Sequence, residues 1–201
     1  MGRYIIVVGS PGAGKTTITS SVKAADLPKG LKLVNVGSLM LDAAKRLKYV
    51  KSRDEIRYLD PARMDKLRTY AFSKLANMAG KVVVDTHGYV EEHGRFVPGL
   101  PLNALSRLHK IEAFIYVDAP EVEMLSRRRK DTSRKREIED PEILKTQRML
   151  NLSALSYYSS AFGMPVYVIE NRSGTLQEST KRYSYIVHEV FGSGNAKKTK
   201  K

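Results

Sequence analysis

The feature that most constrains the fold of this chain is the stretch Gly9–Thr16, "GSPGAGKT". It follows the apolar run "YIIVV", which we read as a buried strand, and it precedes "TITSSVKAA", which we read as part of a helix. The stretch matches the pattern G-x-x-x-x-G-K-[ST] at every fixed position, in the strand–loop–helix context that the pattern requires. The sequence therefore predicts a loop that binds the phosphates of a nucleoside triphosphate.

The residue types in this loop suit phosphate binding. Glycines let backbone N–H groups turn toward phosphate oxygens without a Cβ in the way. The first turn of the following helix adds a partial positive charge. We expect Lys15 to reach the β- and γ-phosphates and the hydroxyl of Thr16 to bind Mg²⁺.

The rest of the sequence indicates alternating strands and helices. We expect strands at 3–8, 31–36, 81–85, 112–118 and 165–170. We expect helices at 15–25, 37–47, 60–78, from 120, from 140 and at 175–191, and a short helix capped by Ser52 and Glu55. Buried strands separated by helices predict a parallel sheet covered on both faces. The expected fold is an α/β P-loop NTPase sandwich of three layers around a five-stranded parallel sheet, in one domain spanning 1–191.

Composition narrows the class of protein. Of the 201 residues, 42% are apolar and 28% are charged, which is the balance of a folded, soluble chain. The sequence contains no cysteine, so disulfides, thiolate metal sites and cysteine nucleophiles are excluded. It shows no secretion signal and no apolar run long enough to span a bilayer. We expect a cytoplasmic protein with no membrane partner.

Basic residues exceed acidic ones by 35 to 21, which gives a net charge of +14. An excess of this size is typical of proteins that bind polyanions such as nucleotides or nucleic acids. The basic residues are concentrated in Arg127–Arg136, "RRRKDTSRKR", and in the tail Ala196–Lys201, "AKKTKK". We expect the tail 192–201 to be flexible, and we keep nucleic acid as a secondary candidate partner.

Two acidic residues follow predicted strands and compete for a role beside the phosphates. Asp85 ends "VVVD", where its carboxylate could hold Mg²⁺ through water, although such a residue can also cap the next loop. Asp118 precedes a helix led by proline, and we expect it to be the N-cap of that helix. His87 could contact a substrate or hydrogen-bond its own loop, and the sequence leaves both roles open.

Arginines suit a phosphoryl group because their guanidinium groups bind oxygens in pairs and stay charged. In the basic run, we expect Arg127–Arg129 to include residues of a solvated helix face, whereas Arg134 and Arg136 are stronger candidates to contact the transferring group. Arg53 and Arg57 lie four residues apart on the short helix, so we expect both to point the same way. They could receive the phosphate of an acceptor or form surface ion pairs.

Taken together, these segments resemble the nucleoside monophosphate kinases, and in particular the archaeal-type adenylate kinases. The segments that carry the resemblance occur in the same order along almost the whole chain: the glycine-rich loop, "GSLML", "SRDEIRYL", "VVVDTHGYV", "PGLP" and the short run "RRRKDTSRKR". The resemblance implies reversible phosphoryl transfer, Mg·ATP + AMP ⇌ 2 ADP. It also implies that a short basic lid at about 127–139 closes over the site and that the chain forms a homotrimer.

The resemblance also implies site residues. The catalytic candidates are Lys15, Arg127, Arg134 and Arg136, and the Mg²⁺ candidates are Thr16 and Asp85. ATP is expected on Gly9, Ser10, Pro11, Gly12, Ala13, Gly14, Lys15, Thr16 and Thr17, with its adenine near Asn171–Gly174. AMP, or ADP in the reverse direction, is expected in a helical region at about 37–79, against Gly37, Ser38, Arg53, Arg57, Asp85, Thr86 and His87. Ser38 stands where relatives often carry an acid and Lys130 where arginine is usual, which leaves the exact AMP contacts open.

Three other functions stay open from the sequence. The first is a P-loop ATPase that works on RNA or the ribosome, using the net charge of +14 and the lysine tail. The second is a nucleotide-binding module without catalysis, against which Lys15, Thr16 and Asp85 argue. The third is a kinase for another monophosphate, such as CMP or dTMP.

Overall fold

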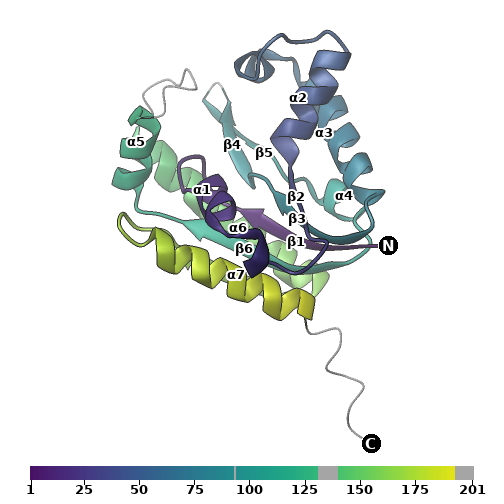
Figure 1. Ribbon diagram of the computed structural model, residues 1–201. Helices are drawn as coiled ribbons and strands as arrows, with labels where there is room; N and C mark the ends of the chain where they lie inside the picture. The colour runs from purple at the N-terminus through teal and green to yellow at the C-terminus, as the bar shows by residue number, and fades with distance from the viewer. Residues whose placement is uncertain (93, 131–139, 193–201) are drawn as a thin grey trace, which may run out of the picture.

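The computed structural model describes residues 1–92, 94–130 and 140–192 (Figure 1). Its central sheet has five parallel strands in the order β2-β3-β1-β6-β7. The predicted five-stranded parallel sheet of a P-loop kinase fold is therefore confirmed. The strands are β1 Gly2–Val8, β2 Lys32–Asn35, β3 Gly80–Asp85, β6 Ile111–Asp118 and β7 Val166–Glu170.

The central strand explains why helices cover both faces of the sheet. Successive side chains of a strand point to opposite faces, and β1 carries buried apolar side chains on both of its faces. Tyr4, Ile6 and Val8 pack in one core cluster, and Ile5 and Val7 pack in the other. The first cluster includes residues of α2 Val36–Arg46, α3 Pro61–Ala76, α4 Leu102–Leu105 and α6 Pro141–Phe162. The second includes residues of α1 Lys15–Ser21, α5 Glu121–Lys130 and α7 Leu176–Gly192 (Figure 1).

The helix starts predicted from Asp–Pro pairs are confirmed. The side chain of Asp60 accepts a hydrogen bond from Arg63 N at 2.9 Å, and that of Asp140 accepts one from Glu142 N at 3.0 Å. In each case the proline follows at the first helical position, where its missing N–H costs nothing.

The capping box predicted for Ser52 and Glu55 is wrong. The segment is a 3₁₀ helix, Asp54–Tyr58, whose N-cap position is Arg53 and has no side-chain cap. The Glu55 carboxylate instead accepts from Lys51 N at 2.8 Å and from Ser52 Oγ at 2.8 Å. These two hydrogen bonds lower the pKa of Glu55. The carboxylate therefore stabilises the turn before the helix, and the first turn of the helix has no such cap.

Several short elements differ from the expectation. The first helix ends at Ser21, and Ala24–Asp26 follows as a separate 3₁₀ turn. The hairpin of β4 Tyr89–Glu92 and β5 Arg95–Pro98 was not predicted, and neither was α4. The hairpin strands have four residues each and lack a fully buried side chain, so they carry little of the alternation by which strands are recognised.

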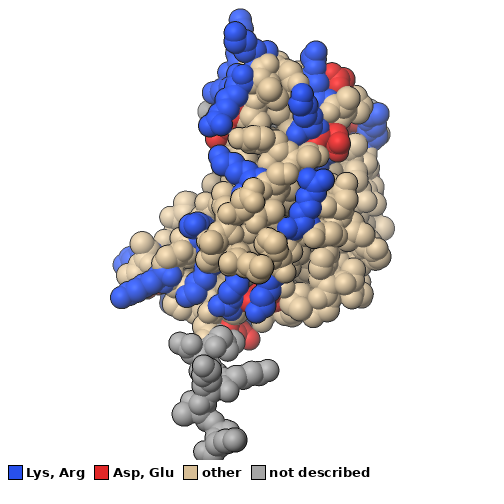
Figure 2. All heavy atoms as spheres, turned by 90° about the vertical axis from the view of Figure 1, so that its right-hand side faces the viewer, with Lys and Arg blue, Asp and Glu red and all other residues tan. Residues whose placement is uncertain are grey.

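The surface reflects the composition. Within the described part of the chain, no helix has both the length and the apolar character needed to cross a bilayer. Figure 2 shows one face of the molecule, on which basic side chains clearly outnumber acidic ones. They are spread over that face and do not gather in a single patch.

Candidate active site

The glycine-rich loop joins β1 to α1 and adopts a conformation that needs its glycines. Gly12 and Gly14 have φ angles of 89° and 92°, in the left-handed region that side chains disfavour. A Cβ on Gly14 would also clash with the side-chain amide of Asn171. That amide donates to Ala13 O at 2.9 Å, so the predicted adenine-side residue Asn171 contacts the loop directly.

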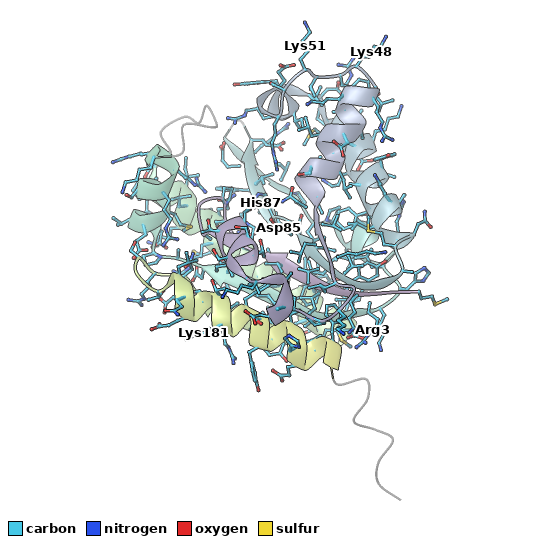
Figure 3. All side chains as sticks on the ribbon, in the orientation of Figure 1. Arg3, Lys48, Lys51, Asp85, His87 and Lys181 are labelled. Atoms are coloured by element: carbon cyan, nitrogen blue, oxygen red, sulfur yellow. The ribbon has the colours of Figure 1, made fainter. Side chains whose placement is uncertain are left out.

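Lys15 is held between the loop and the turn that follows β3. It is only 5% exposed, and its Nζ lies 2.6 Å from Gly9 O and 3.1 Å from Nδ1 of His87. Figure 3 labels His87 near Asp85. His87 Nδ1 also lies 3.0 Å from Gly9 O, so it can accept from the ammonium group in one ring tautomer and donate to the carbonyl in the other. The structure thus places the side chain of Lys15, the lysine predicted to bind phosphate, in contact with His87, a candidate substrate residue.

The Asp85 carboxylate lies at the end of β3 beside α1. Its Oδ2 accepts from Asn35 Nδ2 at 2.9 Å and lies 3.5 Å from the Thr16 hydroxyl. Its Oδ1 is buried and, among the described residues, has no hydrogen-bond partner. A carboxylate with an unsatisfied oxygen beside a hydroxyl is a set of hard oxygen donors, the type that Mg²⁺ prefers. Thr16 and Asp85 therefore fit the metal ion that the sequence predicts for them.

The residues expected to hold the acceptor meet at the N-terminus of α2. Asn35 is the N-cap of this helix, and its Oδ1 accepts from Ser38 N at 2.9 Å, from Ser38 Oγ at 3.2 Å and from Arg53 at 3.3 Å. A Cβ on Gly37 would lie 2.5 Å from the Arg53 guanidinium, so a larger residue here would displace this arginine from its present position. A cavity of about 230 Å³ lies here, lined by Thr16, Thr19, Leu33, Val34, Asn35, Ser38, Arg53, Val83 and Asp85.

The sequence did not predict the local structure at Arg57 and Thr86. Arg57 lies in the 3₁₀ helix, where residues four apart are out of line because each turn has three residues. The α-helical spacing assumed for Arg53 and Arg57 is therefore wrong. Thr86 is 5% exposed, and its N–H donates to Val7 O at 3.0 Å, which fixes the backbone just before His87.

The arginines of α5 support the glycine-rich loop. Arg127 donates to Asn171 O at 2.8 Å and to Glu123 at 2.8 Å, and lies 3.4 Å from Ala13 O. Arg128 is 7% exposed and donates to Pro11 O at 2.7 Å. The prediction of a solvated helix face is wrong for Arg128, because its side chain is turned onto the loop. Arg134 and Arg136 lie outside the described residues.

Asp118 is an ion-pair partner and not a helix cap. The helix after it starts at Glu121, so the N-cap position belongs to Pro120 and the prediction for Asp118 is wrong. Asp118 is 8% exposed, and its carboxylate instead accepts hydrogen bonds from Nε of Arg148 at 2.9 and 3.1 Å and from Nη2 of Arg148 at 2.5 Å. These bonds raise the pKa of Arg148.

The sequence analysis missed two buried amides on α6. Asn151 is fully buried, and its Nδ2 donates to Ser10 Oγ at 3.2 Å while its Oδ1 accepts from Tyr89 N at 2.8 Å. One turn earlier, Gln147 donates to Tyr89 O at 2.8 Å. Both amides occupy apolar-face positions of the helix, in the series Leu144, Gln147, Asn151, Leu155 and Tyr158. Amides at such positions indicate buried polar contacts, and this pattern is visible in the sequence.

Comparisons with known proteins agree with this geometry. Residues 8–145 match the family described as AAA domain. The chain is 32% identical over 183 residues to the adenylate kinase of Methanocaldococcus jannaschii, a match that covers 89% of this chain and 95% of the relative. It is 31% identical over 194 residues to the adenylate kinase of Methanopyrus kandleri, covering 94% and 100%. Shikimate kinase from Acinetobacter baumannii superposes with a TM-score of 0.55 over 96% of this chain and 95% of that one, at 16% identity, a likeness in fold.

Proposed function

From the premise that this chain belongs to the archaeal adenylate kinase family and is a nucleoside monophosphate kinase, we propose that it transfers the γ-phosphoryl group of ATP to AMP, giving two ADP. The observation that carries the proposal is the position of Asp85. This one carboxylate contacts Thr16 of the glycine-rich loop and Asn35 at the N-terminus of α2. A donor segment and an acceptor segment thus meet at a single point, as transfer between two nucleotides requires.

The donor nucleotide has its phosphates on Gly9–Thr17 and its adenine near Asn171. The contact of Asn171 with Ala13 O supports this, because it sets the β7–α7 loop against the phosphate loop. The ammonium group of Lys15, which lies against Gly9 O and His87 Nδ1, is the cation that binds the β- and γ-phosphates.

Mg²⁺ fits Thr16 and Asp85, and when bound it neutralises charge on the β- and γ-phosphates. The chain itself supplies the hydroxyl of Thr16 and a carboxylate whose Oδ2 is oriented by Asn35. Oδ1 is left available, since it has no hydrogen-bond partner among the described residues.

The acceptor monophosphate lies in the region 37–79, against Gly37, Ser38, Arg53, Arg57 and the turn Asp85–His87. Arg53 and Ser38 both reach Asn35 Oδ1, so a cationic group and a hydroxyl converge beside the first turn of α2. This arrangement suits the phosphate of a nucleotide.

The transferring group is stabilised by arginines of the segment 127–139. The contacts of Arg127 with Ala13 O and Asn171 O support this, because they place its guanidinium against the glycine-rich loop. We assign Arg134 and Arg136 to the same task, as lid residues that exclude water from the site. We further propose, from the family alone, a cytoplasmic homotrimer, which sedimentation would detect at three times the mass of the chain.

The test is an acceptor panel. The purified protein is incubated with ATP and Mg²⁺ and with each of AMP, CMP, GMP, UMP and dTMP, and ADP is separated by ion-exchange chromatography. The proposal expects fast ADP formation with AMP, at least a hundredfold above the rate without acceptor. Faster ADP formation with another monophosphate would identify that nucleotide, and not AMP, as the acceptor. Equal slow hydrolysis with every acceptor would contradict the proposal.

A further inference from the structure

Asn35 contacts Ser38 and Arg53 on the acceptor side and the Asp85 carboxylate on the other side. Capping of α2 requires only the contact with Ser38 N. We infer that Asn35 is a positioning residue for phosphoryl transfer, which fixes the acceptor segment relative to the Asp85 carboxylate. The inference rests on the proposed transfer between two nucleotides. It assigns the alignment of two substrates to a residue that lines the acceptor cavity and is hydrogen-bonded both to α2 and to Asp85.

The two ends of the Asn35 amide face different segments. Oδ1 accepts from Ser38 N at 2.9 Å, from Ser38 Oγ at 3.2 Å and from Arg53 at 3.3 Å. Nδ2 donates to Asp85 Oδ2 at 2.9 Å. Because Ser38 N can only donate, the oxygen must face α2, and the NH₂ group must then face Asp85. The orientation of the amide is therefore fixed by its partners.

The backbone reinforces this link. Asn35 ends β2, and it pairs in register with Asp85, which ends β3. The strands bring the two residues side by side, and the side-chain bond then sets the direction of the carboxylate. Figure 3 shows Asp85 in the region where α1 and the lower end of α2 meet. A rotation of α2 about its first turn would break the Asn35–Asp85 bond or pull the carboxylate away from Thr16.

Capping and alignment can be separated because serine is as good an N-cap as asparagine. Asn35→Ser keeps an oxygen for Ser38 N but is too short to reach Asp85. Asn35→Ala loses both contacts. Asn35→Asp keeps the cap and the Arg53 contact but loses the N–H donor to Asp85, and so serves as a second variant if Asn35→Ser folds poorly.

The experiment measures kcat and KM for AMP, the melting temperature, and the Kd of AMP by calorimetry without Mg²⁺. We expect Asn35→Ser and Asn35→Ala to lose kcat alike, by about ten- to a hundredfold, as is usual for a small misplacement of reacting groups. We expect only Asn35→Ala to have, in addition, a lower melting temperature than the wild-type protein. The Kd of AMP should change less than about threefold in Asn35→Ser.

Two results would overturn the inference. One is wild-type kcat in Asn35→Ser with a loss only in Asn35→Ala, because that pattern belongs to a helix cap. The other is a loss of kcat that follows the melting temperature across all three variants. If instead the wild-type protein forms no ADP in an AMP-dependent way, it is the proposed function that fails, and this is known before any variant is compared.

Discussion

Lys15 Nζ and His87 Nδ1 lie 3.1 Å apart, which joins the loop after β1 to the turn after β3. The same ammonium group donates to Gly9 O at 2.6 Å, so Lys15 is anchored at the point where the phosphates of ATP are expected. Figure 3 shows His87 and Asp85 close together at the centre of the molecule. In the proposed reaction the Lys15 cation binds the β- and γ-phosphates, a role that a neutral side chain cannot fill.

Replacing Lys15 tests the donor site. We expect Lys15→Met to lower turnover at least a hundredfold, because a preorganised cation at the transferring group is worth about 3 kcal/mol or more. Stability should change by less than about 1 kcal/mol, since methionine can fill most of the same space. The measurement is AMP-dependent ADP formation together with a melting curve. Lys181→Met, on the exposed side of α7, is the matched control and should keep full turnover (Figure 3).

Asn151 ties α6 to the glycine-rich loop and to the start of β4. We expect Asn151→Leu, a change of similar volume, to destabilise the fold by about 1–3 kcal/mol, because Tyr89 N–H loses its partner in a buried environment. Urea unfolding measures this. Leu152→Ala, at an exposed position one residue further on, should stay within about 0.5 kcal/mol. Equal effects of the two changes would show that the buried amide contributes nothing specific.

The ion pair of Arg3 and Glu112 makes stability depend on pH. The guanidinium binds both carboxylate oxygens at 2.7 Å. Burial alone would raise the pKa of Glu112, but hydrogen bonds from Arg3 and Lys110 outweigh it, and the net pKa is lowered. A carboxyl group with a lowered pKa in the folded state stabilises the protein above its unfolded pKa of about 4.3, and this contribution is lost as the pH falls through the folded value.

Glu112→Gln should therefore cost about 1–2 kcal/mol of unfolding free energy at pH 7 and less at about pH 3, which lies below the unfolded pKa of about 4.3, so that part of the wild-type contribution is already lost there. Denaturant unfolding at the two pH values checks this. Glu142→Gln is the control, because the side chain of Glu142 is 75% exposed and lies 3.7 Å from Lys145. Its effect should be within about 0.5 kcal/mol at both pH values. A cost for Glu112→Gln that stays constant from pH 7 to pH 3 would contradict the account.

Lys48 follows the last turn of α2 with a φ angle of 57°, which is unfavourable for a residue with a Cβ. The hydrogen bonds Tyr49 N to Ala44 O at 2.9 Å and Lys48 N to Lys45 O at 3.1 Å hold it there, directly after the C-cap residue Leu47, in a Schellman motif. Lys48→Gly should raise stability by about 0.5–1 kcal/mol. Lys45→Gly, within the helix, should lower it by a similar amount. The two melting temperatures should move in opposite directions, and a fall for both variants would refute the strain at Lys48.

The sheet and the glycine-rich loop were predictable because their patterns are local. The apolar run Tyr4–Val8 and the glycines after it predict a strand, a loop and the start of a helix within twenty residues. The contacts of Asn35, Asn151 and Arg148 were not predictable in this way. Each joins elements distant in sequence, and Asn151 and Ser10 are separated by 141 positions. Asp118 was misread for the same reason, since its partner Arg148 lies thirty residues away on α6.

The shape of the 3₁₀ helix 54–58 shows a second limit. Its capping pattern, Ser52 and Glu55, is the same in an α-helix and a tight turn, and only the tertiary structure selects between them. The prediction that Arg53 and Arg57 point the same way was wrong for the same reason, because it assumed an α-helix. Arg128 shows a third limit, because a charge run does not reveal which of its members turns inward onto the loop.

The central claim is that a phosphoryl group passes between two adenine nucleotides bound side by side. The most direct test supplies ADP and Mg²⁺ alone and follows ATP and AMP by ion-exchange chromatography. We predict that ATP and AMP appear in equal amounts, because the reverse reaction makes one of each from two ADP. Failure to form any ATP, with slow release of phosphate instead, would contradict the account.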